Sequence, residues 1–392
     1  MNKFTYQYPV KQYFGKGCLE ESLKAELQSM GKTVMLAYGS GSLKRTGLYD
    51  RIRNILEEGG KTVVDFGGIM PNPTYAKVQA GGRAARENKV DFILAVGGGS
   101  VIDCCKIISA QSQTDEDIWD MLYTENRIPT RILPIGAIVT ASGTGAEQNN
   151  GAVITHEDKR LKQPLFGAYH RFAILDSDLT ETLPMKQLVS GAFDTLSHCM
   201  ETYMGQPFAA NVSDDINEAI MRNVITNLRA VIANPADDFA RGELMRDSAM
   251  AENGMLKLGK ITDSQCHMLE HAVGAYTDCN HGQGLAIIHP VLYRHYLPEG
   301  TEKLAKMARN VWGIIEADVW GIIEADDTIA ANAGIDALES FIKEIGLPTR
   351  WSEIGVTDEA ILRKAADSTV LTAGCCKRFT HDELHEVLKE TL

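Results

Sequence analysis

Long apolar runs are missing from this sequence, and residues 1–14 lack the apolar core of a secretory signal peptide. A membrane-spanning helix needs about 20 consecutive apolar residues, and a signal peptide needs a shorter apolar stretch near its start. Cysteine is also scarce, with 8 in 392 residues. The adjacent cysteines Cys104-Cys105 and Cys375-Cys376 cannot readily pair within themselves, because a disulfide demands a particular geometry. These absences predict a cytoplasmic protein with reduced thiols and no membrane partner.

Basic residues are fewer than acidic ones, with 39 Lys+Arg against 52 Asp+Glu and a formal net charge of -13. Binding to a phosphate backbone requires clustered Lys and Arg, so no nucleic-acid partner is expected. Hydrophobic residues make up 44% of the chain, which is enough to bury a core. At 392 residues the chain exceeds the usual size of one domain, so we expect two domains and small-molecule chemistry.

The first half of the chain alternates short apolar or β-branched runs with helical patterns, which is typical of a parallel α/β sheet. The expected strands are 33–38, 62–66, 92–96, 132–139, 152–155 and 172–175, and the expected helices are 47–58, 75–88, 185–203 and 212–232. Strand-like runs almost vanish after Asp176. We therefore place a boundary near Pro184, which gives an α/β domain at residues 1–184 and an all-α domain at residues 185–392.

The octapeptide VWGIIEAD stands at residues 311–318 and again, unchanged, at residues 319–326. A solenoid needs at least three stacked repeats, so two copies indicate a local duplication. A second copy inside one rigid helix would rotate the following apolar face by about 80° beyond two full turns. We therefore expect one copy to be packed and the other to form a surface extension or loop.

A glycine-rich segment stands between an apolar strand and a helical run, and it consists of Gly97, Gly98, Gly99 and Ser100. Glycines let a phosphate approach the backbone, and the N-terminus of the following helix favours an anion. A tight turn without a ligand is the alternative interpretation. No Walker lysine follows these glycines, so phosphoryl transfer is not expected.

A second glycine-rich turn contains Gly39, Ser40 and Ser42, with Lys44 and Arg45 beside them. It lacks the G-x-G-x-x-G fingerprint, and it has no carboxylate that could accept a hydrogen bond from the 2′-hydroxyl of a ribose. This neutral-to-basic setting suits a 2′-phosphate. A solvated loop is the alternative interpretation.

Two pairs of residues spaced four apart point to a metal site. Asp194 and His198 form one pair, His267 and His271 form the other, and His281 follows in a glycine-flanked turn. Residues four apart share a face of a helix, and one carboxylate with three imidazoles suits Zn²⁺ or Fe²⁺. A single histidine on an apolar helix is more often a hydrogen-bonded core residue, but the repeated spacing favours a metal. Spacing alone leaves open which three histidines bind.

A further histidine pair, His381 and His385, superficially resembles the zinc-protease pattern H-E-x-x-H. Asp382 stands at the general-base position of that pattern, and Glu383 is out of register. We interpret this segment as the solvated face of a terminal amphipathic helix.

Taken together and in this order, several segments make the chain resemble the iron-containing alcohol dehydrogenases, and within them the NADPH-dependent butanol dehydrogenase and aldehyde reductase branch. The resemblance covers essentially the whole chain. Besides Asp194 with His198 and the three histidines at 267, 271 and 281, it is carried by residues 14–17, 66–69, 71–73, 97–103, 144–147 and 183–184. Two features depart from the family: Ala146 stands where a serine is usual, and the octapeptide is doubled. Neither departure touches a candidate metal ligand.

The resemblance implies an N-terminal α/β dinucleotide-binding domain and an all-α C-terminal domain, a dehydroquinate synthase-like architecture with a cleft for metal and nicotinamide. The implied metal ligands are Asp194, His198, His267 and His281. His271 is implied to lie near the nicotinamide and to relay the proton. The residues implied to bind the cofactor are Gly97 to Ser100 at the pyrophosphate and Asn72, Asp103, Thr140, Thr144 and Lys162 around the rest.

The resemblance also bears on cofactor choice, since relatives that prefer NAD carry an aspartate at the position of Gly39. Its absence here favours NADP(H) over NAD(H). The expected activity is a metal-dependent alcohol dehydrogenase or aldehyde reductase acting on small primary alcohols and aldehydes such as butanol and butanal, in a homodimer. The bound cation, Fe²⁺ or Zn²⁺, would act as a Lewis acid on the carbonyl oxygen.

Two other functions remain open at this point. A sugar-phosphate cyclase similar to dehydroquinate synthases would need several Lys and Arg near the metal, and the segments around Asp194 and His267 offer few. The third possibility is a metal-binding protein without enzymatic activity.

Overall fold

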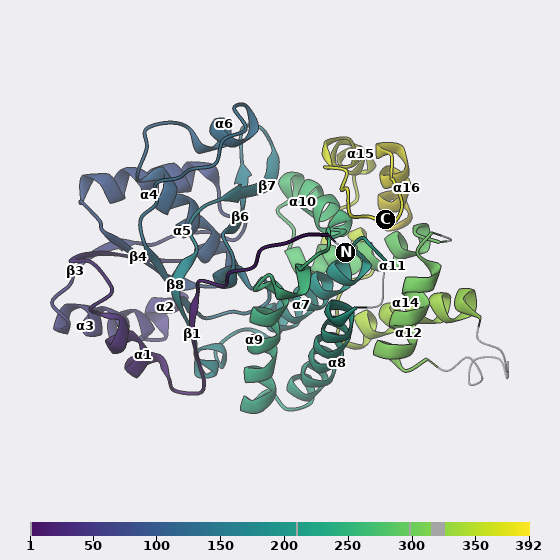
Figure 1. The fold of residues 1–392 in the computed structure, drawn as a ribbon, viewed down its shortest axis with the longest axis horizontal. Coiled ribbons are helices and arrows are strands. Elements are labelled where there is room, and N and C mark those ends of the chain that lie inside the picture. The colour runs from purple at the N-terminus through teal and green to yellow at the C-terminus, as the bar shows by residue number, and fades with distance from the viewer. Residues whose placement is uncertain (1, 209–210, 298, 315–325) are drawn as a thin grey trace. The chain divides into compact units, whose positions relative to one another are not determined.

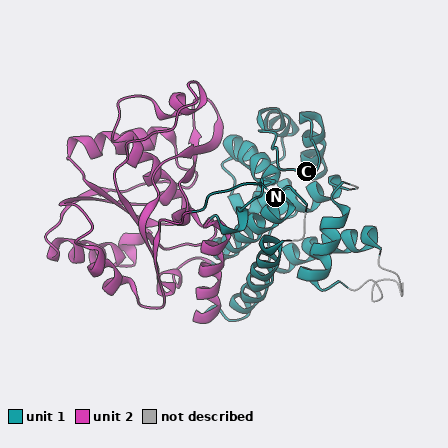
Figure 2. Ribbon diagram, in the orientation of Figure 1, with its two compact units in different colours: residues 1–6, 185–235, 254–392 teal, residues 7–184, 236–253 magenta. Residues whose placement is uncertain are grey.

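The computed structural model of the chain describes residues 2–208, 211–297, 299–314 and 326–392 (Figure 1). These residues form two compact units, which Figure 2 shows in different colours. The sheet unit holds residues 7–184 and 236–253, and the helical unit holds the described parts of 1–6, 185–235 and 254–392. The division of function between residues 1–184 and 185–392 stays a prediction.

A six-stranded sheet in the order β1-β8-β5-β4-β2-β3 organises the sheet unit. The strands of this unit are β1 (Lys11–Phe14), β2 (Thr33–Tyr38), β3 (Thr62–Phe66), β4 (Phe92–Gly97), β5 (Ile135–Val139), β6 (Gly151–His156), β7 (Leu161–Phe166) and β8 (His170–Leu175). Its helices are α1 (Leu19–Glu26), α2 (Ser42–Arg45), α3 (Leu48–Glu58), α4 (Tyr75–Glu87), α5 (Gly99–Gln111), α6 (Ile118–Tyr123) and α9 (Asp238–Glu252). The pairings within the six-stranded sheet are parallel, which confirms the α/β prediction for the first half.

Strand β4 separates two hydrophobic clusters, because successive side chains of a strand point to opposite faces of the sheet. Ile93 and Ala95 pack with residues of α4 and α5. Phe92 and Leu94 pack with residues of α1 and α3 on the other face. Both β4 and β5 are buried along their whole length, as a parallel sheet covered on both faces requires.

Two strand predictions are corrected by the structure. The strand expected at 132–139 begins only at Ile135, because Pro134 has no N–H to donate to a neighbouring strand. The run at 152–155 does not join the parallel sheet, since β6 pairs antiparallel with β7 in a separate two-stranded sheet. The apolar pattern misses β7 because Pro164 and polar residues interrupt it, and it misses β1 because that strand has four residues.

The second unit is helical and contains the candidate metal-site histidines. Its helices are α7 (Met185–Met204), α8 (Val212–Ala233), α10 (Gln265–Thr277), α11 (His281–His295), α12 (Thr301–Trp312), α14 (Asp327–Glu344), α15 (Glu359–Ser368) and α16 (His381–Glu390). The predicted helices at 185–203 and 212–232 are confirmed by α7 and α8. None of the helices in the described ranges is long and apolar enough to span a bilayer.

The octapeptide repeat connects α12 to α14, which pack against each other. Trp312 of the first copy ends α12, and its ring centroid lies 5.7 Å from that of Phe341 on α14. Asp326, the last residue of the second copy, caps α14 by accepting the N–H groups of Thr328 and Ile329. Residues 315–325 lie outside the described part of the chain, so the expectation of one packed copy stays a prediction.

Candidate functional site

Three helices of the helical unit carry the five residues that the sequence singles out as metal-site candidates. Asp194 and His198 lie on α7, His267 and His271 lie on α10, and His281 is the first residue of α11. The four-residue spacing brings each pair onto one face of its helix. Residues far apart in sequence thereby meet within one compact unit.

The first turn of α11 lies close to α7. Asn280 caps this turn, and its side chain accepts the N–H of Gln283 at 3.2 Å. Gly282 permits the approach, because a Cβ at this position would lie only 2.2 Å from the carbonyl oxygen of Ser190. The glycine beside His281 therefore lets that histidine reach α7.

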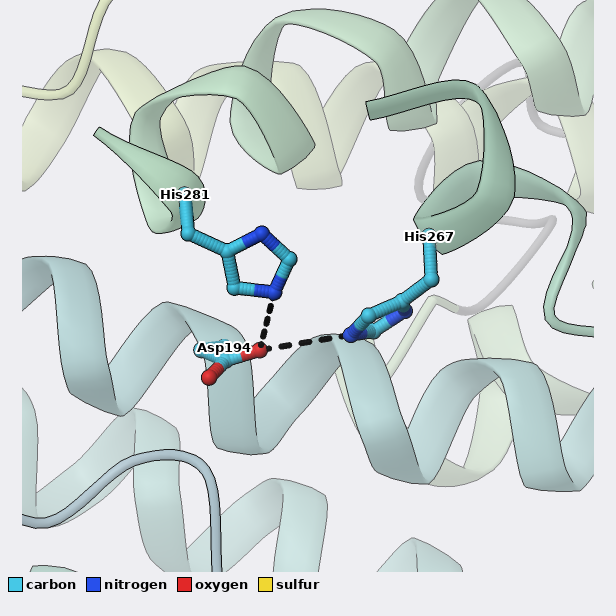
Figure 3. Close-up of side chains that lie close together, drawn as sticks. All are labelled: Asp194, His267 and His281. Carbon is cyan, nitrogen blue, oxygen red and sulfur yellow. Dashed lines mark hydrogen bonds and ion pairs between the residues drawn. The ribbon is translucent and has the colours of Figure 1, made fainter. Parts of the chain in front are cut away.

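The Oδ1 atom of Asp194 is the common neighbour of the cluster (Figure 3). It lies 3.4 Å from Nε2 of His267, 3.4 Å from Nε2 of His281 and 3.7 Å from Nε2 of His198. Metal–ligand bonds of about 2 Å in a tetrahedral site hold the donor atoms about 3.3 Å apart. The ligand atoms of Asp194, His267 and His281 all lie within 4.8 Å of one another, which suits a zinc or ferrous ion, whereas His198 lies outside this group and approaches it through Asp194.

Two buried glutamates that the sequence reasoning missed lie behind the histidines. Glu201 on α7 accepts a hydrogen bond from Nδ1 of His267, and Glu270 on α10 accepts one from Nδ1 of His281. A sequence signal exists, since each glutamate stands three residues after a histidine of its own helix. The pattern does not show that Glu201 bonds a histidine on another helix.

Charges within the cluster shift its ionisation strongly. Burial raises the pKa of Asp194, but the positive charges of neighbouring histidines outweigh it and hold the pKa well below the usual range. Burial lowers the pKa of His267, yet Glu201 and Asp194 together raise it to about 10. Glu270 and Asp194 likewise raise the pKa of His281 against the effect of burial. The cluster thus favours positive charge, which protons or a divalent cation can supply.

His271 lies beside the cluster and is almost completely buried. Its ring stacks on that of His281 with a centroid distance of 5.3 Å. A second group of three potential ligands consists of Glu270, His271 and His281. His281 therefore belongs to two possible metal sites, one with Asp194 and one with His271.

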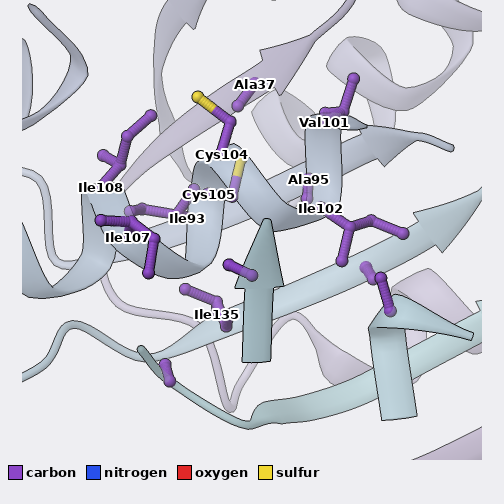
Figure 4. Packing of buried hydrophobic residues seen from close by; sticks show 14 of the residues in the cluster. Ala37, Ile93, Ala95, Val101, Ile102, Cys104, Cys105, Ile107, Ile108 and Ile135 are labelled. Atoms are coloured by element: carbon purple, nitrogen blue, oxygen red, sulfur yellow. The ribbon is translucent and has the colours of Figure 1, made fainter. Parts of the chain in front are cut away.

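In the sheet unit, the predicted pyrophosphate loop joins β4 to α5. Each of its glycines is crowded: a Cβ would lie 2.6 Å from Val101 at Gly97, 3.1 Å from Ala141 at Gly98 and 2.5 Å from Thr144 at Gly99. The buried side chains of α5 hold the helix against β4 (Figure 4). A side chain at any of these three glycines would meet a neighbour at 3.1 Å or less. Gly99 and Ser100 form the start of α5, a 13-residue helix that has no side-chain cap.

The predicted residues Thr140 and Thr144 lie next to this loop. The N–H of Thr140 donates to the carbonyl oxygen of Gly97 at 3.0 Å. Ser248 of α9 holds the segment around Thr144, because its Oγ accepts the N–H groups of Gly143 at 2.9 Å and Gly145 at 3.1 Å. Ser248 is a supporting residue that no local pattern could have predicted, since it lies about a hundred residues further along the chain.

Asp103, a predicted cofactor residue, anchors α5 to the β6-β7 hairpin. Its Oδ2 accepts the N–H of Val153 at 2.9 Å, and its Oδ1 lies 3.3 Å from Nζ of Lys106. The buried Lys106 also donates to Oδ1 of Asn149 at 3.1 Å. At least part of the hydrogen-bonding capacity of Asp103 therefore serves the fold.

The same hairpin links two further predicted cofactor residues, Asn72 and Lys162. Asn72 adopts a left-handed backbone with φ 50 and precedes Pro73, whose carbonyl oxygen accepts the N–H of Thr155 at 2.9 Å. Lys162 is buried on β7 directly opposite Thr155.

Gly39 follows β2 and lies near the start of α5. A Cβ at this position would lie 3.4 Å from the carbonyl oxygen of Ile69 and 3.7 Å from Val101, so a side chain fits there with ordinary contacts. Ser40 and Ser42 are exposed, and Ser42 begins the short helix α2. The structure thus brings Gly39 to the glycine-rich loop and leaves the serines at the surface.

Comparison with known proteins identifies relatives along the whole chain. The model of the iron-containing alcohol dehydrogenase family matches residues 9–177, and that of the Fe-containing alcohol dehydrogenase family, C-terminal, matches residues 188–392. NADH-dependent butanol dehydrogenase A of Clostridium acetobutylicum is 35% identical, with 100% of each chain covered. The NADPH-dependent aldehyde reductase YqhD of Escherichia coli is 34% identical over 92% of this chain and 91% of the relative. The crystal structure of NADH-dependent butanol dehydrogenase A from Thermotoga maritima superposes with a TM-score of 0.92 at 29% identity, covering 100% and 99% of the two chains.

Proposed function

The chain belongs to the iron-containing alcohol dehydrogenase family, and from this membership we propose a role for each part of its site. The protein is an NAD(P)H-linked alcohol dehydrogenase or aldehyde reductase, a class that uses a divalent metal, typically iron. The proposed metal ligands are Asp194, His198, His267 and His281. The observation that carries this proposal is the position of Asp194 Oδ1 within 3.4–3.7 Å of three imidazole nitrogens.

The alternative group of Glu270, His271 and His281 suits a metal less well. Glu270 accepts a hydrogen bond from Nδ1 of His281, so binding a metal there would remove this bond. It would also leave the charge of the buried Asp194 carboxylate to be balanced by protonated histidines alone. We therefore assign the metal to the group around Asp194.

Each part of the proposed site has a distinct chemical task. A divalent cation held there supplies Lewis-acid stabilisation of the negative charge that develops on the carbonyl oxygen. The nicotinamide cofactor supplies the hydride. His271, stacked on His281 at 5.3 Å, is the proposed residue that passes the proton between the alcohol oxygen and solvent.

The sheet unit carries the proposed dinucleotide site. The crowded glycines Gly97, Gly98 and Gly99 let a pyrophosphate lie against the first turn of α5, where backbone N–H groups and the helix dipole favour an anion. The proposed lining residues are Ser100, Asp103, Asn72, Thr140, Thr144 and Lys162. Parallel strands β2, β4 and β5 are neighbours, so their carboxyl ends and these loops share one edge of the sheet.

NADPH is the proposed preferred cofactor. Gly39 leaves no carboxylate directly after β2, and Ser40 and Ser42 are exposed hydroxyls beside Lys44 and Arg45. Asp65, the nearby acid on β3, accepts a hydrogen bond from Tyr38 and lies 3.9 Å from Lys44. Among the relatives, YqhD is NADPH-dependent and the clostridial enzyme is NADH-dependent, so the preference rests on these residues.

Small primary alcohols and aldehydes such as butanol and butanal are the proposed substrates, since the relatives include a butanol dehydrogenase and an aldehyde reductase. The same relatives set aside the sugar-phosphate cyclase and the metal-binding protein without activity. We also propose a cytoplasmic homodimer, in which residues 1–184 bind the dinucleotide and residues 185–392 hold the metal.

One assay tests the proposal. Purified enzyme should oxidise NADPH when butanal is added, lose this activity after metal is removed by a chelator, and regain it with Fe²⁺ or Zn²⁺. Full activity in metal-free protein, verified by elemental analysis, would contradict the metal-dependent mechanism. If the enzyme oxidises NADPH only with other aldehydes, the proposed substrate is wrong and the proposed mechanism stands.

A further inference from the structure

A buried carboxylate stands behind each of two proposed metal ligands. Glu201 reaches from α7 to His267 on α10: one oxygen accepts from Nδ1, and the other accepts the backbone N–H of His267 at 3.1 Å. Glu270 reaches from α10 to His281 on α11, where it accepts from Nδ1 and lies 3.7 Å from Sγ of Cys279. A glutamate on α7 thus hydrogen-bonds a histidine on α10, and a glutamate on α10 hydrogen-bonds a histidine on α11.

Both carboxylates are buried inside the helical unit, and burying a charge costs free energy. The side chains of Glu201 and Glu270 are 3% and 0% exposed. Gly284 provides the space for Glu270, because a Cβ there would lie 2.7 Å from its Cγ. A buried charge is unfavourable unless it is paired and hydrogen-bonded. Two buried carboxylates aimed at histidines therefore call for an explanation beyond packing.

The hydrogen bonds determine which nitrogen of each histidine faces Asp194. An ionised carboxylate can only accept, so the Nδ1 atoms of His267 and His281 must carry their protons toward the glutamates. When such an imidazole is neutral, its Nε2 atom presents a lone pair. Both Nε2 atoms lie 3.4 Å from Oδ1 of Asp194, on the side where the metal is proposed to bind.

We propose that Glu201 and Glu270 are positioning residues, which fix the tautomer and ring orientation of His267 and His281 so that Nε2 of each can bind a metal. This proposal rests on the ligand set given under the proposed function. Partners of this kind raise metal affinity by about 10–100-fold in other metalloproteins. The structure further predicts that the two glutamates differ in how well they tolerate replacement.

The difference follows from the second hydrogen bond of each glutamate. Both oxygens of Glu201 accept from N–H groups of His267, so a glutamine there must turn its NH₂ toward one of two donors. The second oxygen of Glu270 accepts only weakly, from the thiol of Cys279 at 3.7 Å. A glutamine at 270 can keep its oxygen on Nδ1 of His281 and turn its NH₂ toward this sulfur, which can also act as a weak acceptor. Glu201→Gln should therefore weaken metal binding more than Glu270→Gln.

The test measures the dissociation constant for Zn²⁺ by competition with a chromophoric chelator, using full-length metal-free protein and its variants. Glu201→Gln should raise this constant about 10–100-fold, and Glu270→Gln should raise it less. Glu218→Gln is the matched control: Glu218 is a buried glutamate of the same unit that accepts hydrogen bonds from Tyr203 and Asn310. It should bind Zn²⁺ as the wild type does.

Two further measurements separate positioning from folding. The melting temperature of each metal-free variant reports its fold, and the visible spectrum of the Co²⁺-loaded protein reports coordination geometry. Changed affinity and a changed spectrum with an intact metal-free fold support the proposal. Should Glu201→Gln fail to fold, Glu270→Ala, which removes the acceptor of His281, decides: unchanged affinity overturns the proposal, and a loss of about tenfold or more supports it.

A His267→Ala variant distinguishes this proposal from the ligand assignment. If His267→Ala loses Zn²⁺ while both glutamine variants bind it as tightly as the wild type, the positioning role is wrong and the ligand set stands. If His267→Ala binds Zn²⁺ normally, the ligand set itself is wrong, and the positioning role falls with it.

Discussion

The Oδ1 atom of Asp194 lies 3.4 Å from Nε2 of His281, although Asp194 belongs to α7 and His281 opens α11. Donor atoms of one tetrahedral metal site have about this separation. Replacing His281 with alanine should therefore remove the metal and nearly all turnover. Elemental analysis alongside steady-state kinetics checks this. Lost turnover with full, tightly bound metal would take His281 out of the ligand set.

His271→Ala should behave differently, because His271 stacks on His281 and is proposed to move a proton, not to hold the metal. Metal content should stay at the wild-type level. The turnover number should fall by roughly 10²–10⁴-fold, the usual contribution of general acid–base catalysis. A His271→Ala protein that is purified without metal would show that the second group, with Glu270, is the true site.

Gly39→Asp should reverse the cofactor preference from NADPH to NADH. The new carboxylate would repel a 2′-phosphate and could accept the 2′-hydroxyl of NADH. Like charges brought together cost several kcal/mol, so kcat/KM for NADPH should fall by about tenfold or more. Gly39→Ala is the control, since a Cβ at this position meets only ordinary contacts. A wild-type enzyme that already prefers NADH would contradict the proposed preference.

Asp263 should make the stability of the metal-free protein depend on pH. It is fully buried, accepts hydrogen bonds from Tyr296 and the N–H of Gln265, and has its pKa raised to about 7 by burial and by the charge of Glu201. In an unfolded chain the pKa of an aspartate is about 3.9. The folded state therefore binds the extra proton between these values, and stability falls as pH rises from about 4 to about 7.

Asp263→Asn removes the titrating group and keeps one acceptor for the N–H of Gln265. Compared with this variant, the wild type should lose on the order of a few kcal/mol of stability across that pH range. Melting temperatures of both proteins at a series of pH values measure the difference. A constant difference from acid to neutral pH would show that Asp263 is already ionised in the folded protein.

Deleting residues 319–326 should leave a folded, active enzyme. Because the copies are identical, the deletion places Asp318 directly before Asp327, so an aspartate still caps α14. Trp312 keeps its place against Phe341. Metal content and turnover should be near normal. A drop in melting temperature above about 10 °C would mean that the second copy belongs to the core.

Local sequence patterns determined much of the architecture. Apolar or β-branched runs predicted β2, β3 and β4; β2 and β4 are buried almost along their whole length, and β3 is a partly exposed edge strand. Helical spacing predicted α7 and α8. Gly97 to Ser100 marked the junction of β4 and α5, where a Cβ at any of the three glycines would be crowded by a neighbour. The four-residue spacing of Asp194 with His198 put both on one face of α7. Each of these features depends on residues close together in the chain.

Other features were decided only by the tertiary structure, because they depend on contacts between distant segments. The sequences of β1 and β7 lack a clear apolar pattern, and these segments are strands because they pair with β8 and β6. Ser248 supports the loop at Gly143 because α9 packs with the sheet unit. Spacing could suggest that histidines meet, but only the packing of α7, α10 and α11 makes Asp194 their shared neighbour. The same packing turns Glu201 and Glu270 toward His267 and His281, since a hydrogen bond requires a donor and an acceptor to meet in space.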